Sequence, residues 1–163
     1  MDSDIIEKLI KLIPYSTKRD RERDTNFKNN YQTIIFSNYR KELPELLFSM
    51  GFPQENKTEM AYPPKVDYDV GAFWRGVIDG DGSLGIRKQA NSNKKEPYLS
   101  LTTKSEELKE AYCSFLTNIT AKSYNPKRNK RDNIYNITCA LSSAKRILDK
   151  IYQNATIYLD RKY

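Results

Sequence analysis

The sequence contains no histidine, and its two cysteines stand far apart in the chain. With no histidine and no closely spaced cysteine pair, it lacks the ligand patterns of a zinc site and the imidazole of histidine-based acid–base catalysis. We therefore expect Cys113 and Cys139 to be small, buried apolar residues. Any chemistry must come from carboxylates, lysine, arginine, tyrosine, serine or threonine.

Long hydrophobic runs are also missing. No apolar stretch approaches the roughly eighteen residues of a membrane helix, and the start of the chain is acidic where a signal peptide would be basic. We expect a soluble intracellular protein of the cytoplasm, the nucleoid or an organelle matrix, with no membrane partner. Apolar residues make up 38% of the 163 residues, which is enough for a packed core, so a disordered chain is not expected.

Positive charge is what the sequence has in excess. Lysine and arginine number 28 against 21 acidic residues, a net charge of +7, and such an excess often marks a polyanionic partner. A charge run is usually just a solvated face, but here the basic residues gather at three predicted hairpin loops and favour binding of double-stranded DNA through phosphates. They are Lys18, Arg19, Arg21 and Arg23 at the first loop, Arg87, Lys88, Lys94 and Lys95 at the second, and Lys127, Arg128, Lys130 and Arg131 in the third.

A strand-based DNA reader also needs polar side chains on its exposed face to contact base edges. Alternation along the predicted strands does not say which face each residue takes. The candidates are Tyr98, Ser100, Thr102, Tyr124, Tyr135 and Asn136.

Apolar periodicity, caps and breakers predict alternating helices and hairpins. Ser3, Ser105 and Ser142 are the expected helix N-caps, and Gly51 and Gly82 are the expected helix stops. The expected helices are 3–13, 40–50, 70–81, 105–116 and 142–152, and the expected strands are 15–19, 31–36, 83–88, 97–103, 121–126 and 134–140.

These elements repeat, since helix, hairpin and helix follow one another in 3–51 and again in 105–152. A further helix and two strands, 70–103, precede the second copy, and the first copy has no such unit. The chain is therefore expected to divide into a partial first half, 1–64, and a complete half of αββαββα order, 65–163.

Glycines and carboxylates are concentrated in the predicted helix 70–81. Gly76 and Gly80 fall on one helical face, and each costs about 1 kcal/mol in a helix, so they indicate close approach by another helix. Asp79 and Asp81 sit at the helix C-terminus, where the macrodipole disfavours anions. Such a site favours a cation, and Mg²⁺ takes carboxylate, water and phosphate oxygens.

Asp-Gly-Asp-Gly also has two other interpretations. A calcium-binding EF-hand needs glycine at loop position six and glutamate at twelve, and counting from Asp79 places Leu84 and Ala90 there, which excludes it. A plain surface turn remains open.

The segment Trp74 to Gly82, followed by Ser83 and Leu84, resembles the motif of the LAGLIDADG homing endonuclease family. Trp74 and Arg75 replace the leucine and alanine that begin the family motif, and Val77 and Gly80 are mild variants of its residues at those positions. The ending Tyr158 to Lys162 is also similar, and the resemblance covers 65–163 well and 3–64 loosely. The matching letters are Gly76, Ile78, Asp79, Asp81 and Gly82.

The resemblance implies an α+β fold with antiparallel, four-stranded saddle sheets in the major groove, and a Mg²⁺-dependent, site-specific DNA endonuclease of the kind that mobilises introns or inteins. It implies that Asp81 binds the metal, with the Gly80 carbonyl as a further ligand, and that Asp79 supports the helix end. It also implies basic residues near the phosphate, placed by position at Lys57 and Lys162. Either lysine could equally be an ordinary surface charge.

A chain with one motif needs a second helix against Gly76 and Gly80. The resemblance implies a homodimer or a separate chain that supplies the missing first motif. A catalytically inactive DNA- or RNA-binding module, such as a maturase or a regulator, is the alternative on the same scaffold. An RNA-binding structural protein is supported by charge alone.

Overall fold

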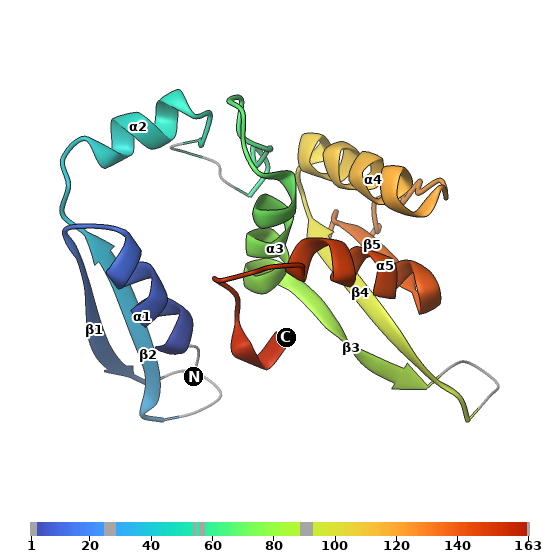
Figure 1. Cartoon of the computed structure of the whole chain (residues 1–163), viewed down its shortest axis with the longest axis horizontal. Coiled ribbons are helices and arrows are strands. Elements are labelled where there is room, and N and C mark those ends of the chain that lie inside the picture. The colour runs from blue at the N-terminus through green and yellow to red at the C-terminus, as the bar shows by residue number, and fades with distance from the viewer. Residues whose placement is uncertain (1–2, 25–28, 54, 56–57, 89–92, 163) are drawn as a thin grey trace.

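The computed structural model describes residues 3–24, 29–53, 55, 58–88 and 93–162, and it shows an α+β chain in two parts (Figure 1). In chain order the elements are α1 (Ser3–Leu12), β1 (Ser16–Arg23), β2 (Tyr31–Asn38), α2 (Leu43–Ser49), α3 (Val70–Asp81), β3 (Gly82–Lys88), β4 (Lys95–Thr103), α4 (Glu106–Thr120), β5 (Tyr135–Ala140), α5 (Leu141–Tyr152) and the short 3-10 helix η1 (Asp160–Lys162).

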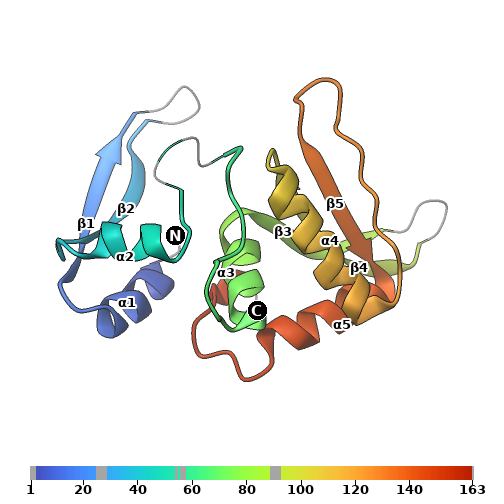
Figure 2. The same ribbon diagram turned by 90° about the horizontal axis from the view of Figure 1, so that it is seen from above.

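The second half holds the core. Its three strands form an antiparallel sheet in the order β3-β4-β5, with Leu99 paired to Leu84 on one side and to Cys139 on the other. Helices α4 and α5 cover one face of this sheet (Figure 2). Because strand side chains alternate between faces, Leu99, Leu101 and Ile137 all point under these helices, where each is at most 2% exposed.

The first half is a β1–β2 hairpin with α1 and α2. The antiparallel register runs from Ser16 opposite Asn38 to Arg23 opposite Tyr31, and β2 is the strand nearer to α3 (Figures 1 and 2). Within the described part of 3–53, Gly51 is the only buried residue. A two-stranded hairpin without a covered apolar face is marginally stable at best, so this half depends on its neighbours.

The helix expected at 70–81 is found with those bounds as α3. The Asp69 carboxylate accepts a hydrogen bond from the Ala72 amide at 2.8 Å, which satisfies one of the unpaired N–H groups at the helix start. At the other end of the preceding connector, Gly51 ends α2 with a φ of 96°, as a C-terminal glycine does.

The strand expected at 121–126 is wrong. Helix α4 continues to Thr120 and ends at Ala121 in the left-handed conformation, φ 57°, and no ladder partner follows in 121–126. Among the described residues the second sheet therefore has three strands instead of the four expected. The cap expected at Ser142 is also wrong, because α5 begins at Leu141 and Ser142 lies inside it.

The first hairpin is longer than expected. Residues 20–23, expected to be loop, continue β1 and pair with Tyr31 to Ile34 of β2. Asp20 to Arg23 are all exposed, so no apolar alternation marked them as strand. Ladder pairing with the β-branched strand opposite outweighs their charged composition.

In the part of the chain that the structure describes, no helix has the length and apolar character needed to cross a membrane.

Candidate functional site

Helix α3 presents two different faces. Trp74 and Ile78 are 2% and 0% exposed and pack into the second-half core. Gly76 and Gly80 lie on the other face, and a Cβ built on either would meet no atom within 4 Å. This open surface is what a closely approaching helix would require. Gly82 is different, since its Cβ would lie 2.7 Å from the Ile78 carbonyl oxygen.

Asp79 is buried in the junction between α3, α5 and the C-terminal segment. Its carboxylate accepts one hydrogen bond from the Tyr152 hydroxyl at 2.5 Å and one from the Leu159 amide at 2.9 Å. Burial, and then the hydrogen bond to Asp79, raise the pKa of Tyr152 well above its usual range. The hydroxyl therefore stays protonated and donates, and Asp79 is fully occupied in holding the helix end.

Asp81 lies at the last position of α3 and is exposed. Its carboxylate makes no hydrogen bond or ion pair within the described residues. One carboxylate with the neighbouring Gly80 carbonyl suits Mg²⁺, which keeps several waters and shares phosphate oxygens. No group of three or more His, Cys, Asp or Glu residues is gathered for a metal in the described ranges.

Of the two lysines expected near the phosphate, the structure describes only Lys162. Lys57 lies outside the described residues. Lys162 places its ammonium at the C-terminal end of α3, where it donates hydrogen bonds to the carbonyls of Ile78, Asp79 and Gly82 at 2.7, 2.8 and 2.6 Å. Sequence spacing did not suggest these acceptors, which lie 80 to 84 residues away.

The open face of the second-half sheet is polar and hydrogen-bonded within itself. Ser83 and Tyr98 share a hydrogen bond between their hydroxyls at 3.1 Å, and Ser100 donates to Asn136 at 2.8 Å. Thr102 alternates onto the same face. Such donors and acceptors, aligned on one accessible surface, are able to contact base edges in a major groove.

Tyr135 and Tyr124, two of the expected base contacts, do not lie on this face. Tyr135 shares strand parity with the buried Ile137, is 7% exposed, and donates its hydroxyl to Glu106 of α4. Tyr124 follows α4 outside any strand, and its hydroxyl lies 3.3 Å from the Thr120 hydroxyl. Both side chains serve the α4 side of the sheet.

The first hairpin separates its basic residues by face. Lys18 pairs with Glu7 of α1 at 2.6 Å, so its side of the hairpin faces that helix. Arg19, Arg21 and Arg23 alternate onto the opposite side and are exposed. This exposed arginine row is able to contact phosphates. Lys18, expected to bind DNA, forms an exposed ion pair with α1, and its contact with DNA stays a prediction.

The second hairpin holds its basic residues close to one another. Arg87 pairs with the buried Glu96 at 2.8 Å and lies over the Tyr98 ring. Lys88 stands opposite Lys95 in the β3–β4 register, and like charges directly opposite are unfavourable. An anionic partner would relieve that repulsion. Lys94 is exposed beside Lys95.

In the third loop, Arg128 differs from its neighbours. It donates to the Lys104 carbonyl at 3.1 Å and lies over the Tyr135 ring, so it organises the loop. Lys127, Lys130 and Arg131 are exposed, and Arg131 pairs with the adjacent Asp132. These three remain the candidates for phosphate contact.

A groove of about 630 Å³ runs beside the glycine face of α3. Gly76, Gly80 and Asp81 form one wall, and α2 with the connector after it forms the other, through Leu47 and Phe52. The groove therefore joins the open helix face to the uncovered apolar residues of the first half.

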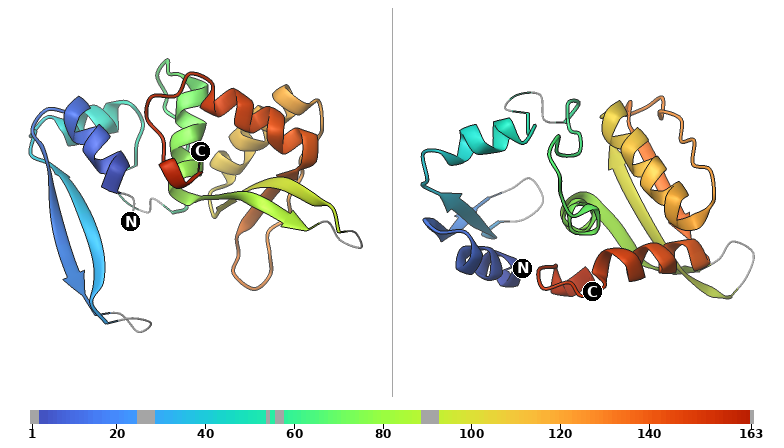
Figure 3. Two further views of the ribbon diagram at one scale, coloured as in Figure 1. Left: turned by 60° about the horizontal axis from the view of Figure 1, so that its bottom comes forward. Right: turned by 45° about the horizontal axis from the view of Figure 1, so that its top comes forward.

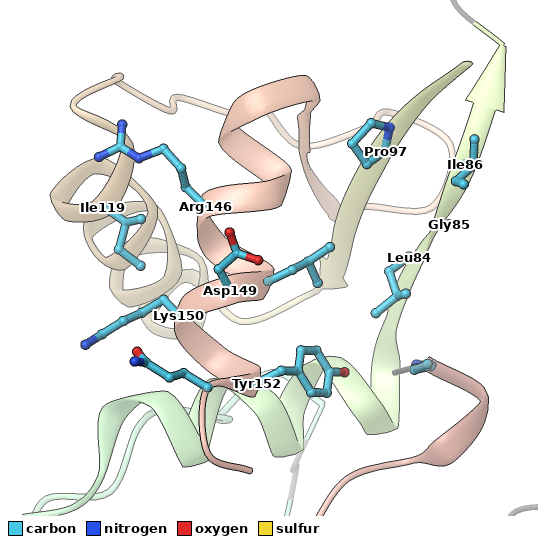
Figure 4. A pocket seen from close by; sticks show the side chains of 12 residues that line it. Leu84, Gly85, Ile86, Pro97, Ile119, Arg146, Asp149, Lys150 and Tyr152 are labelled. Carbon is cyan, nitrogen blue, oxygen red and sulfur yellow. The ribbon is translucent and has the colours of Figure 1, made fainter.

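A second pocket, of about 930 Å³, lies between β3 and α5 and is also lined by Lys162. Figure 4 shows Leu84 and Ile86 of β3 on one side of it and α5 on the other, with the Tyr152 ring of α5 directed toward Leu84. It opens on the helix side of the sheet, opposite the polar face. Its charged lining residues are Arg146, Asp149, Lys150 and Lys162, and neither Asp79 nor Asp81 is among its lining residues.

The LAGLIDADG-like domain family matches residues 69–152. That stretch contains α3 with Asp79 and Asp81, the sheet and both covering helices. The chain belongs to the LAGLIDADG-like family. No curated protein matches the chain.

This family includes homing endonucleases and maturases. Its members bind DNA and often dimerise, and its nucleases use divalent metals. The LAGLIDADG-like match covers the glycine face and the metal candidate but not Lys162 or the first half. The family therefore accounts for the motif helix, and the roles of the flanking segments rest on geometry alone.

Proposed function

We propose that this protein is a site-specific double-stranded DNA endonuclease of the homing type that hydrolyses phosphodiester bonds with Mg²⁺. The observation that carries the proposal is the carboxylate of Asp81, exposed and without a partner among the described residues, at the point where α3 passes into the polar-faced sheet. A protein that only binds DNA gains nothing from an anion at a helix C-terminus next to a phosphate backbone.

In the proposed mechanism the polar face of the sheet contacts base edges, and the exposed basic loops contact phosphates. Asp81 and the Gly80 carbonyl would hold Mg²⁺, and the ion would lower the pKa of a bound water and neutralise developing phosphate charge. Asp79 keeps the helix end in place through Tyr152 and Leu159. No other side chain of α3 has an exposed carboxylate, so Asp81 would be the one side-chain ligand that α3 supplies.

The second set of ligands would come from a partner helix. Gly76 and Gly80 face open space, and the groove beside them leads to a first half whose described side chains are not buried. We propose that a second copy of the chain, or a separate chain with the missing motif, packs here and brings its own carboxylate. The active protein is then not a free monomer.

Cleavage of a randomised duplex library tests the proposal. Wild-type protein with Mg²⁺ is expected to cut a limited set of sequences, and EDTA to prevent it. Asp81→Asn keeps the shape and removes the charged ligand, so it should abolish cutting while DNA affinity stays within about twofold. Full cleavage by Asp81→Asn would refute the assignment.

A catalytically inactive nucleic-acid-binding module, of the maturase or regulator kind, is the second candidate. Its support is the second set of metal ligands, which the described residues do not supply, whereas the exposed carboxylate of Asp81 itself favours the endonuclease. Binding to duplex DNA and to structured RNA, compared over a range of salt, separates the two, since RNA is recognised chiefly in its loops and by its shape. Preference for RNA with no cleavage of any duplex would favour this candidate.

A further inference from the structure

Lys162 lies at a helix end that has an unusual concentration of negative charge. The last four carbonyls of any helix lack partners within it, and here Asp79 and Asp81 add carboxylates to the negative end of the dipole. Helix α3 has no basic residue in its own last turn. The cation that this end requires comes instead from η1, through the Lys162 ammonium.

The ammonium is fully engaged there. A protonated lysine has three N–H groups, and Lys162 directs them to the carbonyls of Ile78, Asp79 and Gly82, all within 2.8 Å. These acceptors span the change from helix to strand, because Gly82 is the first residue of β3. Contact with a phosphate would require breaking one of these bonds.

The backbone at this point has little room to adjust. Gly82 comes so close to Ile78 that a Cβ on it would lie 2.7 Å from the carbonyl oxygen. Lys162 binds the same carbonyl and the Gly82 carbonyl together. Lys162 therefore holds the backbone on both sides of Asp81, at Ile78 and at Gly82. This fixes the direction in which the Asp81 side chain leaves the backbone.

A C-terminal strap, residues 157–162, delivers the lysine. Along α3, Arg75 donates to the Ile157 carbonyl at 2.8 Å, and Asp79 accepts from the Leu159 amide at 2.9 Å. The Lys162 amide then donates to the Leu159 carbonyl at 2.8 Å, which closes the 3-10 turn. Together with the Lys162 ammonium, the strap is thus attached to α3 at three successive points: Arg75, Asp79 and the carbonyls at the helix end.

The strap also touches the first half. Asp160 pairs with Lys8 of α1 at 2.8 Å, and its amide donates to the Asp4 carboxylate at 3.2 Å. Figure 3 shows this segment lying between α1 and α3. The residue two positions before Lys162 therefore links the first half to the end of the motif helix.

We infer that Lys162 is a positioning residue: it caps the C-terminal end of α3 and fixes the backbone that carries Gly80 and Asp81, and it does not contact the phosphate. Its effect on the metal rests on the proposed function, whereas the cap itself does not.

The test compares Lys162→Met, which keeps the length and loses charge and donors, with Lys162→Arg, which keeps the charge. Lys145→Met, at an exposed position of α5, is the matched control. A planar guanidinium does not match three converging carbonyls as an ammonium does. Arginine should therefore rescue a role that needs only charge, but not this cap.

Two measurements on the full chain decide. Amide hydrogen exchange of residues 79–83 should quicken by about tenfold or more in Lys162→Met and Lys162→Arg, with α4 and the Lys145→Met control unchanged. The MnCl₂ concentration that half-broadens the Asp81 amide signal should rise several-fold in both. Any loss of cleavage should be recovered at high Mg²⁺.

Unchanged exchange in Lys162→Met would overturn the cap. Unchanged Mn²⁺ response, with cleavage lost even at saturating Mg²⁺ and restored by arginine, would overturn positioning and assign a phosphate contact. If wild-type protein shows no Mn²⁺ response, the proposed metal site fails, and the exchange data still decide the cap. Should Lys162→Met not fold, Lys162→Arg carries the same comparison.

Discussion

The Tyr152 hydroxyl donates to the Asp79 carboxylate across 2.5 Å, and this contact joins the end of α5 to the end of α3. Removing the hydroxyl in Tyr152→Phe leaves a buried carboxylate with one donor fewer, at a cost of about 1–3 kcal/mol. Asp79→Asn should also destabilise the chain, because its amide would accept from the Leu159 amide and donate to the Tyr152 hydroxyl oxygen, so two charge-assisted hydrogen bonds become neutral ones. Urea unfolding measures both. Stability of either variant equal to wild type would contradict this contact.

The glycines of α3 should respond in opposite ways to alanine. Gly76→Ala and Gly80→Ala enter open space, so each should stabilise the isolated chain by about 0.5–1 kcal/mol through helix propensity. Gly82→Ala should destabilise it, because its Cβ would lie 2.7 Å from the Ile78 oxygen. Thermal unfolding below the association concentration provides the comparison.

Larger side chains on the same face test assembly. Gly76→Leu or Gly80→Leu should prevent a helix from approaching and stop cleavage, while the circular dichroism of the chain is preserved. Sedimentation of wild-type protein is expected to show self-association, or association once a partner is present. A cleavage-competent monomer without a partner would rule out the shared site.

The arginine row of β1 should carry salt-dependent DNA affinity. Replacing Arg19, Arg21 and Arg23 with Gln should reduce the slope of log K against log salt by up to about 2.7, at roughly 0.9 for each phosphate that the variant no longer neutralises. Lys18→Gln is the control, since Lys18 is paired with Glu7 on the α1 side. Equal effects of the control and the triple variant would mean that the hairpin does not present this face to DNA.

The loop after α4 allows a second binding test. Replacing Lys127, Lys130 and Arg131 with Ala should weaken binding to all duplexes and lower the salt slope, without loss of stability. Arg128→Ala should instead destabilise the loop, because it removes the contacts to the Lys104 carbonyl and the Tyr135 ring. Unchanged affinity in the triple variant would show that this loop points away from DNA.

Cys139 should make the fold sensitive to alkali. Burial raises the pKa of Cys139 to about 11, from the value of 9.0 for an unperturbed thiol. Between these values the folded chain binds more protons than the unfolded one, so stability falls as pH rises, by at most about 3 kcal/mol. Cys139→Ala should reduce this slope between about pH 9 and 11 in denaturant titrations. An identical slope would show that other groups cause the alkaline loss.

Sequence alone located the motif helix, because glycine spacing, apolar periodicity and a glycine stop all agree over 70–81. It also predicted that Cys113 and Cys139 would be buried, and both are. The strand at 121–126 could not be excluded in this way. Its failure depends on α4 running four residues further than expected, to Thr120, and on the left-handed turn of Ala121.

The finer roles of site residues needed three-dimensional contacts. Nothing near Asp79 in the chain indicates Tyr152, which is 73 positions away. Lys18 and its arginine neighbours lie on opposite faces of the hairpin. Which face each residue takes is known only once the β1–β2 register is known. Lys162 was expected beside the site, but its three acceptors come from tertiary packing that no local pattern encodes.

Because buried residues are concentrated in the second half, the two halves should differ in how fast their amide hydrogens exchange. Amide hydrogens in β4, beneath α4 and α5, should exchange only when the whole chain unfolds, whereas those in β1 and β2 need only a local opening of the first half. A protease should therefore cleave the β1–β2 hairpin while α3 remains folded. Bound DNA or a partner chain should slow this cleavage. The rate of limited proteolysis would therefore report whether the protein is bound to DNA or to a partner chain.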